Sequence, residues 1–329
     1  MSRKIMIIDA MNSVFRSYAV DPTVNDKGEH IGALKGFLKQ MQKMCREIKP
    51  DEIYVIWDGV GGSSRRRSMN KGYKEGRKAV DPARYNRHVD FNMSEEELQK
   101  NKAWQISRIA EYLNEMPVKQ FVYENIEADD AIALLSKFDC LKDDYKIIIS
   151  NDRDFYQLLD DKTIIYRAVT KRYMTKADVI AEEGVHPNNM TLVRAICGDK
   201  SDNLPGIKGV GIKTLVKNFP FLIEENRKYV DDLVEEIKSM ENPSKVIQEI
   251  VYEKSTVIDN FRIMQLYNPV IKKEALEQLE ELACYSEADM DWTKVQSMMI
   301  QDGFGTYNWT SLHDCFKSII SNNKEQTNE

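Results

Sequence analysis

Nine acidic residues of this 329-residue chain stand where carboxylates could bind cations and do chemistry. Some directly follow short apolar runs, and others form dense acidic groups further along the chain. Crowded carboxylates repel one another unless they take up protons or bind cations. Divalent ions such as Mg²⁺ prefer oxygen ligands, and pairs of such ions hydrolyse phosphodiesters in many enzymes. These residues are Asp9, Asp58, Glu127, Asp129, Asp130, Asp152, Asp154, Asp199 and Asp202.

The apolar runs before these acids indicate how residues so far apart in sequence could meet. Residues 4–8, 53–57, 118–123 and 146–150 form such runs, and 164–166 predict one more. Short apolar runs of this kind are typical of strands buried on both faces of a parallel sheet. Ligands of open α/β sheets bind at the carboxyl ends of the strands, so we expect the acids to converge on one edge. Each acid taken alone could instead be a helix cap or a turn residue.

Helical periodicity separates the runs, at residues 32–48, 104–113 and 128–138. Alternating strands and helices predict an α/β fold with a central, mostly parallel sheet flanked by helices. Residues 59–103 break this alternation and are too long for a simple connection. They indicate a functional loop or a helical insertion. After about residue 175 the pattern becomes helical and polar.

A glycine-rich segment at residues 198–211 reads GDKSDNLPGIKGVG and leads into a short helical pattern. Its glycines would let the backbone approach a phosphate closely, and the next helix N-terminus would offer free N–H groups. Lys208 and Lys213 would add positive charge. The alternative is a tight turn between two helices with glycine at the cap. Neither a Walker loop nor a dinucleotide-binding G-x-G-x-x-G motif fits the sequence.

The densest basic stretch runs from Arg65 to Lys78 and contains one tyrosine. Basic residues with an interleaved aromatic suit a phosphate backbone with a stacked base. The stretch follows closely on the apolar run that ends at Asp58, which favours a functional role. Taken alone, a run of charges could equally be solvated surface.

The bulk composition is ordinary for a globular protein, with 42% hydrophobic and 30% charged residues. The net charge of −6 does not exclude a nucleic-acid partner, because the nine acids alone account for all of it. No run approaches the ~20 apolar residues of a membrane span, and we expect no signal peptide. The five cysteines and four histidines are scattered, so we expect reduced cysteines and no zinc site.

In their order along the chain, these motifs resemble the 5′ nuclease or flap endonuclease superfamily. That superfamily includes free-standing phage 5′-3′ exonucleases of the ribonuclease H type and the 5′-exonuclease domain of bacterial DNA polymerase I. The most specific matches are the EADD and GDKSDNLPG segments, and the resemblance covers about residues 4–220. The matching segments are Ile8-Asp9 with Arg16 and Tyr18, Ile56-Trp57-Asp58, Tyr73-Lys74-x-x-Arg77, and residues 127–130, 152–159 and 198–211.

The resemblance implies a PIN-like 5′ nuclease core at residues 1–174 that includes a helical arch at 59–103. It implies a helix–hairpin–helix DNA-binding subdomain at 175–240, and it leaves 241–329 as a C-terminal helical region without a role. Two Mg²⁺ ions are implied, for which Mn²⁺ could substitute, and a K⁺ ion is allowed at the hairpin. Residues 80–102 depart from the polymerase I pattern, so the arch differs from it in detail.

The resemblance also implies roles for single residues. Ligands of the first, catalytic metal site would be Asp9, Asp58, Glu127 and Asp129, and those around the second would be Asp130, Asp152, Asp154, Asp199 and Asp202. Lys74 and Arg77 resemble the residues that reach the scissile phosphate, and Tyr73 resembles an aromatic that stacks on a terminal base. Nucleic-acid contacts would be Arg16, Arg66, Arg67, Tyr73, Lys74, Arg77, Gly206, Lys208, Gly209, Gly211 and Lys213.

The implied function is a structure-specific, two-metal 5′-3′ nuclease. It would cut near the 5′ ends of flap DNA and RNA–DNA duplexes, with RNase H activity, and remove primers and flaps during phage or bacterial DNA replication. A single-strand DNA-binding protein and a sliding clamp are the implied partners of a monomer in the cytoplasm of a bacterial or phage-infected cell. Two alternatives remain open, an acidic-cluster RNA endonuclease and a non-catalytic DNA-binding accessory protein.

Overall fold

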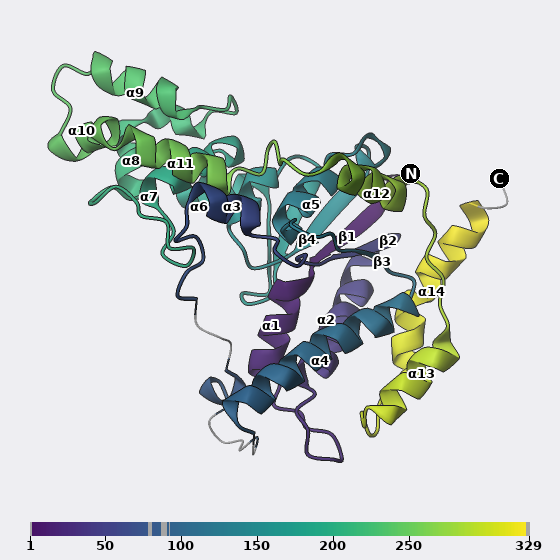
Figure 1. Ribbon diagram of the computed structural model, residues 1–329. Coiled ribbons are helices and arrows are strands. Elements are labelled where there is room, and N and C mark those ends of the chain that lie inside the picture. Colours follow the sequence, from purple (N-terminus) through teal and green to yellow (C-terminus); the bar gives the residue numbers. More distant parts are fainter. Residues whose placement is uncertain (1, 78–80, 87–90, 92, 327–329) are drawn as a thin grey trace.

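The computed structural model describes residues 2–77, 81–86, 91 and 93–326, which contain a six-stranded sheet of order β3-β2-β1-β4-β5-β6 (Figure 1). The first five strands are parallel, and β6 pairs with β5 in the antiparallel sense. The strands are β1 (Lys4–Asp9), β2 (Glu52–Ile56), β3 (Lys119–Phe121), β4 (Tyr145–Ile149), β5 (Thr163–Arg167) and β6 (Arg172–Met174). The predicted mostly parallel sheet is therefore confirmed, and β6 is an addition that the sequence analysis did not predict.

The central strand β1 shows why the apolar runs became strands. Its side chains alternate between two hydrophobic clusters, with Ile5 and Ile7 in one and Met6 and Ile8 in the other. Successive side chains of a strand point to opposite faces, so an unbroken apolar run fits a sheet that is covered on both sides. Ile8 pairs with Val55 of β2 and Ile149 of β4, so these three strands end side by side.

Helices cover both faces of the sheet (Figure 1). The face of Met6 and Ile8 packs against α1 (Ala10–Val20), α2 (Gly32–Ile48) and α4 (Glu95–Asn114). The opposite face packs against α5 (Ala128–Leu135). The range of α2 was predicted from the sequence, whereas α1 was not, and α4 begins nine residues before its predicted start.

The predicted arch at residues 59–103 contains α3 (Ser64–Met69), a 3₁₀ turn at Pro82–Arg84 and the first part of α4. The Ser94 hydroxyl caps α4 by accepting a hydrogen bond from the backbone N–H of Glu97, and the Glu97 carboxylate accepts one from the backbone N–H of Ser94. This capping box explains why α4 starts within the polar run. Residues 78–80, 87–90 and 92 of the predicted arch lie outside the described residues.

The second half of the described chain is helical, as predicted. Its helices are α6 (Lys176–Glu183), α7 (Met190–Cys197), α8 (Ile212–Asn218), α9 (Val230–Ser239), α10 (Lys245–Tyr252), α11 (Lys254–Met264), α12 (Lys273–Cys284), α13 (Trp292–Gln301) and α14 (Trp309–Gln326). The helix α11 packs against α7, whereas α12 returns to α5 and α14 to α2. The described part of the C-terminal region, residues 241–326, is therefore shared between two parts of the molecule. No helix within the described residues is long and apolar enough to cross a membrane.

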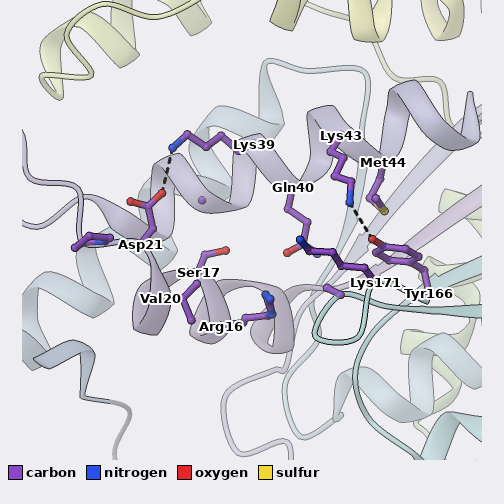
Figure 2. A pocket seen from close by; sticks show the side chains of 13 residues that line it. Arg16, Ser17, Val20, Asp21, Lys39, Gln40, Lys43, Met44, Tyr166 and Lys171 are labelled. Carbon is purple, nitrogen blue, oxygen red and sulfur yellow. Dashed lines mark hydrogen bonds and ion pairs between the residues drawn. The ribbon is translucent and has the colours of Figure 1, made fainter. Parts of the chain in front are cut away.

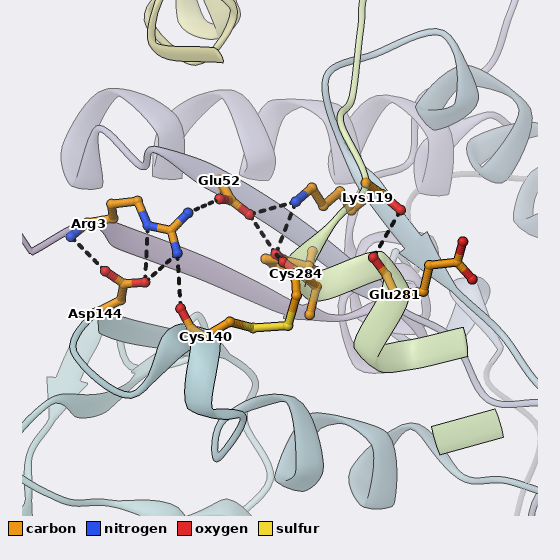
Figure 3. The surroundings of a disulfide bond; sticks show 10 residues. Arg3, Glu52, Lys119, Cys140, Asp144, Glu281 and Cys284 are labelled. Atoms are coloured by element: carbon orange, nitrogen blue, oxygen red, sulfur yellow. Dashed lines mark hydrogen bonds and ion pairs between the residues drawn. A yellow bond between two sulfur atoms is a disulfide. The ribbon is translucent and has the colours of Figure 1, made fainter. Parts of the chain in front are cut away.

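One disulfide, Cys140–Cys284, joins a 3₁₀ turn before β4 to the last residue of α12 (Figure 3). It lies beside a polar network in which Arg3 pairs with Glu52 and Asp144. The expectation that the cysteines are reduced is therefore wrong for this pair. The two cysteines are 144 residues apart in sequence, and their spacing carries no signal that pairs them.

Candidate active site at the carboxyl edge of the sheet

The predicted acids gather where β1, β2 and β4 end. Asp9 is the last residue of β1, and its side chain caps α1 by accepting a 3.1 Å hydrogen bond from the backbone N–H of Asn12. Its other carboxylate oxygen accepts a 2.9 Å hydrogen bond from the Ser150 hydroxyl, directly after β4. The buried Asp9 side chain therefore caps α1 and also belongs to the acidic cluster.

The next strand brings a second group of acids to this edge. Asp58, two residues after β2, accepts a 2.8 Å hydrogen bond from the backbone N–H of Ala128, the first residue of α5. This contact fixes the start of α5 against the end of β2. Glu127, Asp129 and Asp130 stand at that helix start, where the macrodipole favours negative charge.

A third group follows β4 and reaches the glycine-rich segment. The Asp152 side chain accepts a 2.8 Å hydrogen bond from the backbone N–H of Asp154. Arg194 of α7 then bridges Asp154 at 2.6 Å and Asp199 at 2.5 Å. Asp199 also accepts a 2.6 Å hydrogen bond from the backbone N–H of Ser201. The two predicted acidic segments are therefore held together by one arginine.

Burial and mutual repulsion make this cluster unfavourable for bare carboxylates. Burial, followed by the charge of Asp58, raises the pKa of Asp9 to about 7. Burial and Asp152 likewise raise the pKa of Asp154 to about 7 and that of Asp129 well above its ordinary value. Asp152 acts on both carboxyls, so the acids after β4 and those at the start of α5 form one electrostatic unit.

The donor set at this edge fits a hard divalent cation, because every candidate ligand is a carboxylate oxygen. Within the described residues, no three His, Cys, Asp or Glu side chains already surround a common point as metal ligands would. Basic side chains instead face several of the acids. Cations therefore already offset part of the negative charge, and a metal would join or replace them.

Lys74 and Arg77 are the basic side chains that the sequence analysis placed at the site. Lys74 forms an ion pair with Glu127, and Arg77 forms one with Asp202. The backbone of Lys74 is left-handed, with φ of 57°, and its N–H donates to the carbonyl of Asp202 at 2.9 Å. The turn before Arg77 is thus fixed against the loop that carries Asp202.

These contacts shift the pKa of Glu127 in the opposite direction from those of Asp129 and Asp130. Burial raises the pKa of Glu127, but Arg66 and Lys74 lower it by more, so the net shift is downward. Burial lowers the pKa of Lys74, but Glu127 and Asp129 raise it by more. Both groups are therefore charged at neutral pH.

Two predicted nucleic-acid contacts are placed differently in the structure. Arg66 is 3% exposed, pairs with Glu127 and donates to Asp130 at 2.9 Å. Tyr73 is also 3% exposed and packs with Leu204 in a small apolar cluster. Neither side chain is free to meet DNA, because each is enclosed by the protein. The order of residues in a basic stretch does not reveal which side chain turns inward.

Arg194 and Ser150 contact the acids without having been singled out from the sequence. Arg194 is the single charged residue of helix α7, and Ser150 follows a buried strand. Serine is common after a strand, so Ser150 carries no signal. The spacing from Arg194 to Asp199 becomes meaningful only when the turn between them is known.

The glycine-rich hairpin lies between α7 and α8. A Cβ atom on Gly206 would lie 1.9 Å from the carbonyl oxygen of Cys197, so only glycine fits there. Gly209 has φ of +81°, which also favours glycine. Lys208 and Lys213 are exposed beside it, as are Gly209 and Gly211.

Arg16 lines a separate pocket of about 470 Å³ between α1 and α2 (Figure 2). The other cations that line the pocket are Lys39, Lys43 and Lys171. Lys39 pairs with Asp21 at 3.3 Å, and Lys43 donates to the Tyr166 hydroxyl at 3.2 Å. These cations come from three separate segments, so the sequence alone does not group them.

Comparison with known proteins gives a consistent result. A family model for the 5′-3′ exonuclease, N-terminal resolvase-like domain matches residues 4–185. DNA polymerase I of Bacillus subtilis (strain 168) is 31% identical over 223 residues, which are 65% of this chain and 23% of the polymerase. A 5′-3′ exonuclease of Aquifex aeolicus (strain VF5) is 29% identical over 215 residues, 65% of this chain and 68% of the exonuclease.

The fold also matches a solved structure. The bacteriophage T5 flap endonuclease, in a pseudo-enzyme–product complex with DNA and metal ions, has a TM-score of 0.63 and 18% identity to this chain. The match covers 92% of this chain and all of the T5 chain. At this identity the likeness shows the fold alone. The chain spans about a quarter of the length of the polymerases that it matches.

Proposed function

The chain belongs to the 5′-3′ exonuclease family, and we propose that it is a divalent-metal-dependent, structure-specific 5′-3′ nuclease. Its proposed substrates are flap DNA and RNA–DNA duplexes with a 5′ end, and its proposed role is removal of primers and flaps during bacterial or phage DNA replication. The observation that carries this proposal is the carboxylate cluster where β1, β2 and β4 end. Membership of a family does not by itself establish the reaction, which depends on the residues of the site.

We propose that two Mg²⁺ ions act at this edge, with Mn²⁺ as a substitute. The first would be held by Asp9, Asp58, Glu127 and Asp129, and the second by Asp130, Asp152, Asp154, Asp199 and Asp202. When bound, such ions lower the pKa of a water nucleophile and offset charge on the phosphoryl oxygens. Arg66 already pairs with both Glu127 and Asp130, so the ions would share these two carboxylates with its guanidinium.

The chain's own cations would act on the scissile phosphate. Lys74 is half-buried beside Glu127, so its ammonium stands at the cluster where the phosphodiester must approach. Positive groups fixed in place stabilise charge that develops on oxygens during the reaction. Arg77 is more exposed than Lys74 and pairs with Asp202, so it suits a phosphate that enters from solvent.

DNA would be held through its phosphates on both sides of the cluster. On one side lies the pocket of Arg16, with Lys39, Lys43 and Lys171. On the other lies the hairpin, whose contacts would be Gly206, Lys208, Gly209, Gly211 and Lys213. A K⁺ ion would bind at this hairpin. Arg67, which is exposed on α3, would add one more phosphate contact. Contacts with phosphates give affinity without reading the base sequence. The T5 enzyme of the same fold was solved with DNA and metal ions, which supports this arrangement.

We propose that the chain is organised as a nuclease core at 1–174, a hairpin subdomain at 175–240 and a C-terminal region at 241–329. We also propose that the protein is a monomer in the cytoplasm and that its partners are a single-strand DNA-binding protein and a sliding clamp. The family match covers the first of these three regions and extends just beyond it.

The substrate is tested with three 5′-labelled molecules, a flap duplex, an RNA-primed duplex and a single-stranded RNA, each with Mg²⁺ or EDTA. Asp152→Ala serves as the inactive control. We expect Mg²⁺-dependent release of short 5′ fragments from the flap and the RNA-primed duplex, and none from the variant. Cleavage of the single-stranded RNA alone would favour the RNA endonuclease. Tight DNA binding without any cleavage would favour the accessory protein.

A further inference from the structure

The end of α11 is a buried segment that touches several parts of the candidate site. Residues 260–266 cover the last turn of α11 and the two residues that follow it. Ile263, Met264 and Leu266 are buried. The segment lies outside residues 4–185, which the family model matches, and it carries no sequence motif. Its contacts with the site run through three buried polar side chains, Arg66, Gln157 and Asn260.

The first contact ties the segment to the acids at the start of α5. The Arg66 Nε donates a 2.9 Å hydrogen bond to the carbonyl of Ile263. The other guanidinium nitrogens of Arg66 donate to Glu127 and Asp130. A planar guanidinium holds its three sides at fixed angles, so the Ile263 carbonyl helps to set where Glu127 and Asp130 lie.

The second contact ties the segment to the acids after β4. Gln157, 5% exposed, donates to the carbonyls of Asp154 at 2.8 Å and Met264 at 3.0 Å. Its Oε1 accepts hydrogen bonds from the backbone N–H of Leu266 at 2.6 Å and the Thr191 hydroxyl at 2.8 Å. All four hydrogen-bonding positions of this amide are used. The loop that carries Asp154 is thus anchored to the segment.

The third contact ties the segment to the glycine-rich hairpin. Asn260, 2% exposed, donates to the carbonyls of Ala195 at 2.9 Å and Pro205 at 2.8 Å. Pro205 lies three residues after Asp202, in the loop that pairs with Arg77. The helices α11 and α7 also pack against each other, and α11 contacts α3.

We propose that residues 260–266 are a positioning segment that sets the spacing between the acids at the start of α5 and those after β4. A segment that only filled the core would need apolar contacts and no buried polar side chains. A buried polar group costs free energy unless its hydrogen bonds are made. Here the hydrogen bonds of each buried polar side chain join the segment to a part of the molecule that carries a candidate metal ligand. The inference rests on the proposed function, because spacing matters only if these acids share metal ions.

The test compares two buried glutamines with the same number of hydrogen bonds. Gln157→Met removes the links from the segment to the Asp154 loop. Gln105→Met is the matched control, because Gln105 is fully buried, accepts from Ala33 and Leu34, and donates to His30 and Asn101, away from the acids. Unfolding in urea, calorimetric binding of Mn²⁺ without DNA, and kcat and KM for a flap substrate are measured for both.

We expect similar losses of stability in the two variants, but weaker Mn²⁺ binding only in Gln157→Met. Loss of a group that orients ligands lowers metal affinity by about 10–100-fold, and kcat should fall while KM for DNA stays within about twofold. Mn²⁺ binding equal to wild type in Gln157→Met, or an equal loss in Gln105→Met, overturns the inference. A wild-type protein without metal-dependent cleavage overturns the proposed function itself and the inference with it.

A second variant keeps the test open if Gln157→Met does not fold. Arg66→Lys keeps a positive charge beside Glu127 and Asp130, but a single ammonium cannot reproduce the fork that also reaches the Ile263 carbonyl. We expect it to bind Mn²⁺ more weakly than wild type while it still binds flap DNA in Ca²⁺. Unchanged Mn²⁺ binding would show that the tie to Ile263 does not set the acids.

Discussion

Two groups of basic side chains flank the carboxylate cluster, and they differ in what they face. The inner group, Arg66, Lys74 and Arg77, is paired with acids of the cluster itself. The outer group, Arg16, Lys39, Lys43 and Lys171, lines a pocket between α1 and α2 and pairs in part with surface acids. The inner group comes from the densest basic stretch of the sequence, whereas the outer group is assembled from separate segments.

Local density of positive charge therefore does not identify by itself which cations contact phosphate, because the densest stretch holds both the enclosed Arg66 and the more exposed Arg77. A guanidinium that is paired inside the protein neutralises carboxylates and stabilises the fold, and it meets no DNA. Exposed lysines whose partners are surface acids can exchange those partners for phosphates. The inner cations should therefore affect stability and the chemical step, and the outer cations should affect binding and its dependence on salt.

The largest expected effect concerns the acids that the inner group surrounds. Asp129→Asn removes one charge from the proposed first metal site, and we expect cleavage to fall by about a thousandfold, equivalent to about 4 kcal/mol of transition-state stabilisation. Binding of flap DNA in Ca²⁺, measured by fluorescence anisotropy, should persist. Glu280→Gln makes the same change of charge on the exposed face of α12 and should leave cleavage unaltered. Equal activity in wild type and Asp129→Asn would remove the acid cluster from the account.

Removal of the innermost cation tests the structural side of the comparison. Arg66→Ala removes the buried guanidinium that pairs with both Glu127 and Asp130, and we expect a loss of about 3–5 kcal/mol in the free energy of unfolding. Urea denaturation measures it. Arg67→Ala, on the exposed face of the same short helix, is the matched control and should change stability by less than about 0.5 kcal/mol. Similar stabilities of the two variants would contradict the distinction between buried and exposed arginines.

Lys74 should separate chemistry from binding. Lys74→Met keeps the length of the side chain and removes the charge beside Glu127. We expect kcat to fall about a hundredfold, as for loss of one fixed charge-stabilising group, with little change in affinity for flap DNA. Single-turnover cleavage with saturating enzyme measures the chemical step directly. A loss that appeared only in DNA affinity would move Lys74 into the outer group.

The smallest expected effect belongs to the outer group. The double variant Lys39→Gln/Lys43→Gln should bind flap DNA about tenfold more weakly at low salt, with kcat unchanged. The slope of log affinity against log salt should become shallower by about one for each lost phosphate contact. Lys272→Gln/Lys273→Gln, at the exposed start of α12, removes the same charge elsewhere. An equal effect of the two double variants would show that only net charge matters.

The sheet edge could be predicted from sequence because strands of a parallel sheet end together. Asp9 and Asp58 follow apolar runs in β1 and β2, and the alternation of strands and helices places those ends on one side. The helix start at Glu127 was also recognisable, because three acids in four residues exceed what a cap needs. Such features are local in sequence, and folding only brings them together in space.

Other features depend on contacts between distant segments, so the sequence could not show them. Arg66 is buried because Glu127, Asp130 and the Ile263 carbonyl surround it, and the last lies 197 residues away. Tyr73 turns inward because Leu204 and α11 cover it. The helix α1 was not predicted, although Asp9 caps it and a helix cap was one of the two roles expected for such an acid. The Cys140–Cys284 pair has the same origin in long-range packing.

The most direct test of the central claim is a titration of Mg²⁺ against cleavage of a 5′-labelled flap duplex, from EDTA to millimolar concentrations, in wild type and Asp129→Asn. The account predicts no cleavage in EDTA, cleavage that rises with Mg²⁺ to a plateau in wild type, and no comparable rise in the variant. Cleavage by the wild type that is equally fast in EDTA, or identical titration curves for the two proteins, would contradict it.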